Sequence, residues 1–198
     1  MPDLGAPTYT RDTFSDRRYD HLANGSRGHA VPIIDGHMQK PGRDRRAEVS
    51  ECRDDGQRTV FGLRLEQAYD LPGLLRFSRE WCWHYAEQTL LMRDSFSFSA
   101  PSHDIVETLL FRDRPLIAQP GMMEVDAGVC RLDIMYPATA GVRISRETYT
   151  TRKGEEESVY IVSFGIACEG RSIETDISIR IGQCGKYSSV RTSPSTKA

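Results

Sequence analysis

The sequence lacks any apolar run that is long enough to cross a lipid bilayer. Residues 1–5 also lack the basic start and the apolar stretch of a secretory signal peptide. These two absences argue against a helical membrane protein, and we expect no membrane partner. We therefore expect a soluble chain that stays in the cytoplasm.

The cysteines lack the CxxC spacing that is typical of zinc knuckles and redox motifs. Their number is odd, so they cannot all form disulfides within one chain, and reduced thiols are the simpler interpretation. Two of them lie within apolar strand patterns, where a thiol behaves as a small buried hydrophobe, and we expect these two to be buried. The five cysteines are Cys52, Cys82, Cys130, Cys168 and Cys184, and the two expected to be buried are Cys130 and Cys168.

The chain also lacks a strong excess of either charge, because its net charge is −2 and its isoelectric point is about 6.2. A protein that binds nucleic acid or an anionic membrane through its overall field is usually strongly basic. No nucleic-acid partner is therefore expected. Local basic clusters can still bind an acidic sugar polymer.

Short apolar segments recur between Gly, Pro, Asp and Asn, which is the rhythm of an all-β protein. A chain of 198 residues with 38% hydrophobic residues can bury one substantial core. We predict one domain over residues 1–187, a mainly antiparallel two-sheet sandwich of roughly ten or more strands, and a disordered polar tail over residues 188–198. The expected strands are residues 31–34, 47–52, 59–65, 74–83, 88–93, 104–111, 122–125, 130–136, 142–145, 159–166 and 173–181.

Local patterns make some of these predictions specific. Residues 122–125 and 130–136 flank a turn that contains Gly128, so we expect them to form a hairpin. Trp81 and Trp83 fall on one face of a strand, which favours a buried sheet surface over a sugar-stacking groove.

Asp94 follows Arg93 where a strand is expected to leave the core, so we interpret it as a turn or sheet-edge residue. Neither His84 nor His103 has a partner pattern, and we interpret both as structural.

The segment around residues 14–39 concentrates charge, aromatic rings and imidazoles around a short apolar strand. Residues 31–34 form that strand, and Asp35-Gly36 is a typical turn signal after it. His29 then lies at the strand end, where a side chain can point into a cleft. The alternative is a partly buried imidazole that hydrogen-bonds to the backbone of a turn.

The first forty residues resemble the C-terminal β-sandwich domain of the heparinase II/III family of polysaccharide lyases. The matching pieces are Asp3-Leu4-Gly5 followed by Tyr9, then Gly28-His29, then Ile33-Ile34-Asp35-Gly36. The resemblance implies a β-sandwich that contributes to β-elimination on uronic-acid polysaccharides. Lyases of this kind usually carry a long helical domain before the β region, and many of the parent enzymes are exported.

The resemblance also implies a partial metal site. Asp3 and His29 match a carboxylate and an imidazole that bind zinc, or another divalent metal, together with a His from a strand that this sequence does not contain. Two ligands do not make a tight zinc site, unless His21 or His37 also approaches the metal. Ala30 replaces the polar residue that commonly follows the family's His, which weakens the support around the metal.

Substrate contacts are expected from arginines and tyrosines near the motif. Arg18 and Arg27 can grip a uronate or sulfate group, with solvated surface charges as the alternative, and Tyr9 and Tyr19 can stack on sugar rings. The groups that remove the sugar proton in this family lie in the missing upstream segment, so we assign no catalytic residue.

The expected function is the β-sandwich portion of a truncated lyase that is inactive as the isolated chain. The expected partners are an acidic polysaccharide and either a helical partner domain or further copies of the chain. The alternative function is a non-catalytic carbohydrate-binding or scaffolding module.

Overall fold

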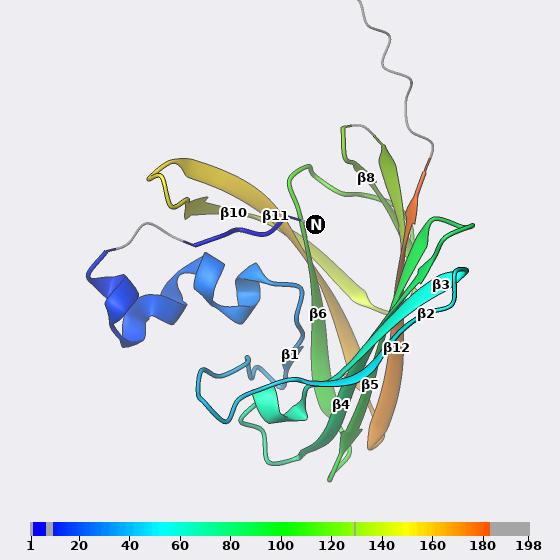
Figure 1. Ribbon diagram of the computed structural model, residues 1–198, viewed down its shortest axis with the longest axis horizontal. Helices are drawn as coiled ribbons and strands as arrows, with labels where there is room; N and C mark the ends of the chain where they lie inside the picture. Colours follow the sequence, from blue (N-terminus) through cyan, green and yellow to red (C-terminus); the bar gives the residue numbers. More distant parts are fainter. Residues whose placement is uncertain (1, 7–9, 129, 183–198) are drawn as a thin grey trace, which may run out of the picture.

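The computed structural model describes residues 2–6, 10–128 and 130–182. They form two antiparallel β-sheets that pack face to face (Figure 1). The smaller sheet has the strand order β1-β6-β11-β10, and the larger sheet has the order β2-β3-β4-β5-β12-β9-β8-β7. The prediction of an all-β, mainly antiparallel two-sheet sandwich is therefore confirmed.

Each predicted strand overlaps a strand of the structure. The strands are β1 (Ile33–Ile34), β2 (Glu48–Asp54), β3 (Arg58–Arg64), β4 (Leu74–His84), β5 (Thr89–Phe98), β6 (His103–Phe111), β7 (Leu116–Gln119), β8 (Met122–Asp126), β9 (Arg131–Met135), β10 (Gly141–Thr150), β11 (Glu156–Cys168) and β12 (Ser172–Ile181). The short 3-10 helices are η1 (Asp12–Phe14), η2 (Asp16–Asp20), η3 (Leu22–Asn24), η4 (Ser26–Gly28) and η5 (Glu66–Ala68).

The hydrophobic core lies between the two sheets. Side chains alternate between the two faces of each strand, so Ile105, Leu109 and Phe111 of β6 all point inward. They meet residues such as Phe96 of β5 and Ile177 of β12 from the larger sheet. The predicted hairpin over residues 122–136 is confirmed, because β8 pairs with β9 in antiparallel register.

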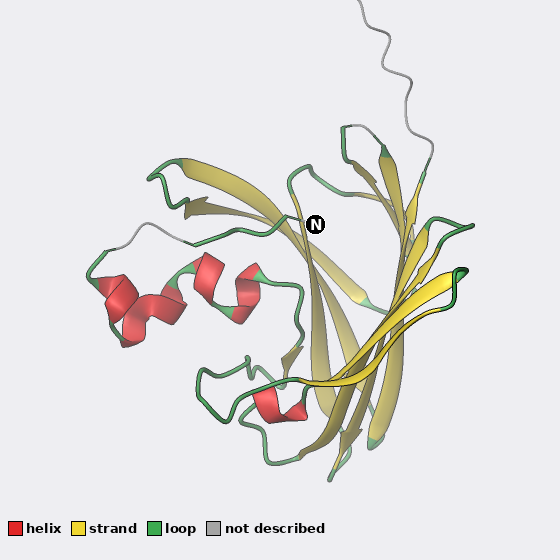
Figure 2. Cartoon of the chain, in the orientation of Figure 1, coloured by secondary structure: helices red, strands yellow, loops and turns green. Residues whose placement is uncertain are grey.

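The outer face of the smaller sheet is also covered. Leu110 and Ile161, which point away from the core, pack with Leu4, Leu22 and Ala23 of the N-terminal segment. Figures 1 and 2 show η1 to η4 gathered beside the four-stranded sheet, away from the eight-stranded sheet. Burial of both faces explains the nearly continuous apolar runs of β6 and β11.

Three sequence predictions require correction. Strand β1 contains only Ile33 and Ile34, and Pro32 before it has no N–H to donate to a sheet. Strand β5 continues through Asp94 to Phe98, so Asp94 is not a turn or edge residue but a buried residue of a central strand. Strand β7 was not predicted, because its four residues are all exposed and carry no alternating pattern.

The four described cysteines are free thiols, as the sequence indicated. Cys168 is buried as expected, whereas Cys130 lies just before β9 and is only partly buried. Cys184, Tyr9 and the predicted tail over residues 188–198 lie outside the described residues. Within the described ranges, no helix is both long enough and apolar enough to cross a membrane.

Candidate functional site

Two glycines allow the 3-10 helices of the N-terminal segment to pack closely together. A Cβ atom added to Gly28 would lie 2.0 Å from the carbonyl oxygen of Leu22, and one added to Gly25 would lie 2.9 Å from that of Tyr19. Neither position can carry a side chain without moving the backbone. The close packing brings η2 against the turn that precedes η4, and thereby collects polar side chains on one side of the smaller sheet.

These side chains line two adjoining cavities. The first, which we call the histidine cavity, has a volume of about 800 Å³ and is lined by residues that include Asn24, His29, Val31, His37 and Lys40. The second, which we call the β10 cavity, has a volume of about 660 Å³ and is lined by residues that include Asp20, His21, Arg27, Glu147 and Tyr149. Tyr19, Gly25 and Met38 line both cavities, so the two cavities are neighbours.

The histidine cavity favours an anionic ligand. His29 is exposed, and its Nε2 donates to the carbonyl oxygen of Ala23 at 3.2 Å. His37 is also exposed, and its Nδ1 donates to the carbonyl oxygen of Asp35 at 3.0 Å. Lys40 adds an ammonium group, and no described residue that lines this cavity is acidic. The cavity therefore offers imidazole and ammonium groups without a competing carboxylate.

The β10 cavity has a mixed charge. The guanidinium of Arg27 donates from Nη2 to Oε1 of Glu147 at 3.0 Å, which links η4 to β10. The hydroxyl of Tyr149 donates to Oε2 of Glu157 at 2.7 Å, and this hydrogen bond lowers the pKa of Glu157. Because the charges of Arg27 and Glu147 offset each other, this cavity attracts an anion less strongly than the histidine cavity does.

The turn that carries His37 is anchored to β6. Asp35 and Gly36 have φ angles of 49° and 75°, as a tight hairpin turn requires, and Ile34 bridges to His37. The carboxylate of Asp35 accepts from Nδ1 of His103 at 2.6 Å and from the backbone N–H of Asp104 at 2.8 Å. This confirms the prediction of a turn at Asp35-Gly36 and gives His103 the structural role that the sequence indicated.

The structure brings only some of the predicted site residues together. Tyr19, Arg27 and His29 line the cavities. The guanidinium of Arg18 lies 5.3 Å from the centre of the Tyr19 ring, but Arg18 does not line either cavity. Tyr9 lies outside the described residues. His29 is at the end of η4 rather than at a strand end, because β1 begins four residues later.

The residues implied as metal ligands do not by themselves fit a zinc site. Asp3 is exposed, and its Oδ1 accepts from the backbone N–H of Gly5 at 2.9 Å. Its neighbour Leu4 packs close to Gly28, the neighbour of His29, so the two segments are adjacent. Zinc takes four ligands in structural sites, and catalytic sites use three from the protein. No group of three His, Cys, Asp or Glu side chains converges on one point among residues 2–6, 10–128 and 130–182.

Sequence reasoning missed the contributions of Lys40 and Asn24 to the site, and it named His37 only as a further metal ligand. His37 follows the predicted Asp35-Gly36 turn directly, so its position was a usable signal. Lys40 and Asn24 carry no such signal, because they reach the cavity only through the packing of the 3-10 helices. Trp81 packs against the core and stacks on Phe61 at 5.8 Å, which agrees with the buried-sheet interpretation.

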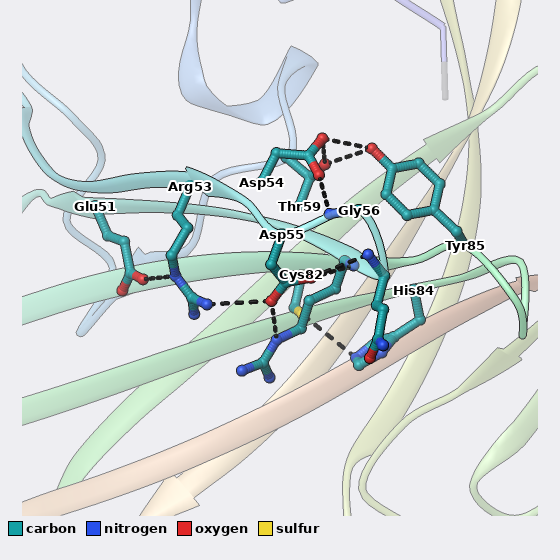
Figure 3. A network of polar contacts seen from close by, with 11 residues as sticks. Glu51, Arg53, Asp54, Asp55, Gly56, Thr59, Cys82, His84 and Tyr85 are labelled. Carbon is teal, nitrogen blue, oxygen red and sulfur yellow. Dashed lines mark hydrogen bonds and ion pairs between the residues drawn. The ribbon is translucent and has the colours of Figure 1, made fainter.

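A second polar cluster lies at the tip of the β2–β3 hairpin (Figure 3). The carboxylate of Asp54 accepts from the hydroxyls of Thr59 and Tyr85 and from the N–H of Gly56, and these hydrogen bonds lower its pKa. Figure 3 also shows Cys82 beside His84, with Sγ 3.3 Å from Nε2. Because the donors and acceptors of this cluster satisfy each other, we interpret it as a clamp that holds the hairpin tip.

Neither a model of a known protein family nor a curated protein sequence matches the chain. Its fold is similar to that of two lyases of known structure. Heparan sulfate lyase HepC from Pedobacter heparinus matches with a TM-score of 0.68 and 12% identity, over 93% of this chain and 28% of that one. Heparinase III, the BT4657 gene product, matches with a TM-score of 0.69 and 10% identity, over 91% of this chain and 28% of that one.

These similarities concern the fold. At identities of 12% and 10%, they show that the chain has the architecture of a β region found in heparan sulfate lyases. The predicted resemblance to the β-sandwich domain of such lyases is confirmed at this level. The chain spans less than a third of the length of these lyases.

Proposed function

We propose that this chain is the β-sandwich portion of a polysaccharide lyase of the heparinase II/III type, and that it binds acidic polysaccharide in the two cavities around Tyr19. The fold supports the link to lyases, since both similar structures are named as enzymes of this class. The observation that carries the binding role is the histidine cavity, which combines His29, His37 and Lys40 with no acidic lining residue.

The chemistry of β-elimination explains what this part contributes. The reaction needs a base for the proton at C5 of the uronic acid, an acid for the leaving sugar, and positive groups beside the carboxylate. Lys40 is suited to the last of these tasks, His37 can donate a hydrogen bond beside it, and the exposed ring of Tyr19 is suited to stacking on a sugar. We assign neither the base nor the acid to described residues of this chain.

The binding role is tested by calorimetry with a heparan sulfate oligosaccharide. The double variant His37→Gln and Lys40→Gln is expected to bind about tenfold more weakly, because it removes charge-assisted contacts worth about 1.4 kcal/mol. The matched control is Arg58→Gln, which also removes a positive charge but lies at the β2–β3 hairpin and lines neither cavity. Equal affinities of the double variant and the unchanged protein would refute the binding site.

We also propose that the base and the acid come from a helical partner domain, which leaves the chain without appreciable lyase activity by itself. The coverage supports this, since about 72% of each similar lyase has no counterpart in this chain. The alternative is a carbohydrate-binding module with no enzymatic partner. Absorbance from unsaturated uronate, measured with the purified chain and heparan sulfate, tests the inactivity that both cases predict, and a rise with the chain alone would contradict both. A helical partner domain that produces the rise only together with this chain would favour the lyase portion over the module.

A further inference from the structure

Three buried charged residues form a polar layer across the middle of the sandwich. Arg79 of β4, Asp94 of β5 and Glu107 of β6 expose only 2%, 1% and 0% of their surfaces. The inward neighbours of Glu107 on β6 belong to different core clusters, Ile105 to one and Leu109 to the other. The three charged side chains therefore separate two apolar halves of the core.

The guanidinium of Arg79 is held from several sides. Its Nε donates to Oδ1 of Asp94 at 2.7 Å, its Nη2 also contacts Oδ2 of Asp94, and the same Nη2 donates to Oε2 of Glu107 at 2.8 Å. The rings of Phe77 and Trp81 lie 5.9 Å and 5.7 Å from the guanidinium carbon. The group therefore has little freedom to turn.

The remaining nitrogen of Arg79 points toward the N-terminal segment. Nη1 donates to the carbonyl oxygen of Ala30, the residue after His29. A second buried side chain acts on the same stretch, because the hydroxyl of Tyr69 donates to the carbonyl oxygen of Pro32 at 2.7 Å. Two side chains from the interior thus hold carbonyls on either side of Val31, which lines the histidine cavity.

Stability alone does not explain such a layer. Three charged groups lose their hydration when they are buried, and well-packed apolar residues of similar volume are often as stable or more stable. What an apolar core cannot supply is a fixed donor for the carbonyl of Ala30. This stretch has little other support, since β1 pairs with β6 through only Ile33 and Ile34.

We propose that Arg79 and Tyr69 are positioning residues for the histidine cavity: they fix the stretch from Ala30 to Pro32, and with it the exposed imidazole of His29. Asp94 and Glu107 act through Arg79 by orienting its guanidinium. The role in ligand binding rests on the proposed function. The role in holding the stretch does not, and it can be measured without a ligand.

The test compares two variants of the full chain. Arg79→Met combined with Asp94→Val and Glu107→Leu replaces the polar layer by apolar residues, so the fold is kept while the donor to Ala30 is lost. Tyr69→Phe removes only the hydroxyl that binds the carbonyl of Pro32. The matched control is Tyr85→Phe, which removes a hydroxyl at the β2–β3 hairpin tip.

The first measurement needs no ligand. In the triple variant, amide hydrogen exchange of Ile33, Ile34 and Asp35, which follow the held stretch and lie in the β1 pairing or its turn, is expected to become at least tenfold faster, with a change in the side-chain nitrogen shifts of His29. Tyr69→Phe is expected to accelerate the same amides several-fold. Amides of β8, which pairs with none of the substituted strands, and the amides of Ile33, Ile34 and Asp35 in Tyr85→Phe serve as references and are expected to stay unchanged. A folded triple variant with unchanged exchange at these three amides would overturn the proposal.

The second measurement is the affinity for a heparan sulfate oligosaccharide, which is expected to fall about tenfold in the triple variant and to stay unchanged in Tyr85→Phe. Unchanged affinity in a folded triple variant would overturn the positioning of the cavity. If the unchanged protein does not bind the oligosaccharide at all, the proposed function fails, and the exchange measurement still decides whether Arg79 and Tyr69 hold the stretch.

Discussion

Glu107 exposes none of its surface, and its Oε1 has no hydrogen-bond partner among the described residues. Burial raises the pKa of Glu107 well above its usual range, the charge of Asp94 raises it further, and the charge of Arg79 only partly offsets these effects. Two buried carboxylates next to one guanidinium would otherwise leave a net negative charge in the core. We predict that Glu107, which Arg79 contacts once, rather than Asp94, which Arg79 contacts twice, is the carboxyl group of the pair that carries a proton.

This protonation state predicts opposite results for two nearly isosteric substitutions. Glu107→Gln replaces a neutral acid by a neutral amide that does not ionise in the unfolded chain, so the free energy of unfolding at pH 8 is expected to rise by more than about 1 kcal/mol. Asp94→Asn removes the charge that pairs with Arg79 and is expected to lower it by about 3 kcal/mol. Urea unfolding of both variants checks this, and equal losses in the two would contradict the assignment.

The pH dependence of Glu107 follows from the direction of its shift. Because its pKa is raised in the folded state, its stabilising contribution is complete below the unfolded value of 4.5 and is lost as the pH rises toward the folded value. Glu107→Gln removes this dependence. The stability of the unchanged protein should therefore fall relative to that of Glu107→Gln as the pH increases from about 4.5.

At the scale of elements, the short strand β1 depends on contacts at its ends. His103, the first residue of β6, donates from Nδ1 to the carboxylate of Asp35 at 2.6 Å and from Nε2 to the carbonyl oxygen of Ala100 at 2.8 Å. Both partners accept, so both ring nitrogens carry protons and the ring is an imidazolium. Phe98 stacks on this ring at 3.8 Å, which fixes its plane.

The hydrogen bonds of His103 to Asp35 and Ala100 predict a loss of stability at alkaline pH. Burial lowers the pKa of His103, but the hydrogen bonds to Asp35 and Ala100 and the charge of Asp35 outweigh this effect, so the pKa is raised overall. The stabilising contribution is complete below the unfolded value of 6.5 and is lost as the pH rises through the folded value. We expect these hydrogen bonds of His103 to contribute about 1 kcal/mol to the free energy of unfolding at pH 6 and little above pH 9.

The measurement is urea unfolding between pH 5 and pH 9, comparing the unchanged protein with His103→Gln. The difference in unfolding free energy is expected to be largest at the acidic end of this range and to shrink toward pH 9. His84→Gln is the matched control, because His84 lies on β4 and contacts Cys82 instead of a carboxylate. A difference that does not vary with pH would contradict the imidazolium assignment.

At the scale of the whole molecule, the sandwich carries a third layer on one side. The N-terminal segment with η1 to η4 covers part of the outer face of the smaller sheet, and the two cavities lie between this layer, the turn at Asp35-Gly36 and strand β10. A ligand in these cavities would therefore contact both the N-terminal segment and the edge strand of the sheet. We propose that a partner domain completes this side of the site.

The same incompleteness applies to the metal that the resemblance implies. Asp3 and His29 would supply two ligands, whereas zinc in proteins normally has at least three from the protein. After incubation with zinc and dialysis, the purified chain is expected to hold well below one equivalent, with no change in His29→Ala. Elemental analysis checks this, with His84→Ala as the control. One equivalent of zinc that is lost only in His29→Ala would show that the chain builds the site alone.

The sequence by itself determined most of the strands, the hairpin of β8 and β9, and the turn at Asp35-Gly36. These features depend on side-chain alternation and on turn residues, which are properties of neighbouring positions in the chain. The hairpin of β8 and β9 was predictable for this reason. Strand β7 and the 3-10 helices were not, because short exposed strands and single helical turns carry no repeating pattern.

Only the tertiary structure decided which polar residues meet. Arg79, Asp94 and Glu107 come from three strands of two different sheets, and the sequence pattern at Asp94 gave no sign of its burial. Arg27 and Glu147 lie 120 positions apart along the chain, yet they pair at the β10 cavity. Such contacts depend on how sheets and segments pack in three dimensions, which local propensity does not encode, and the candidate site consists mainly of contacts of this kind.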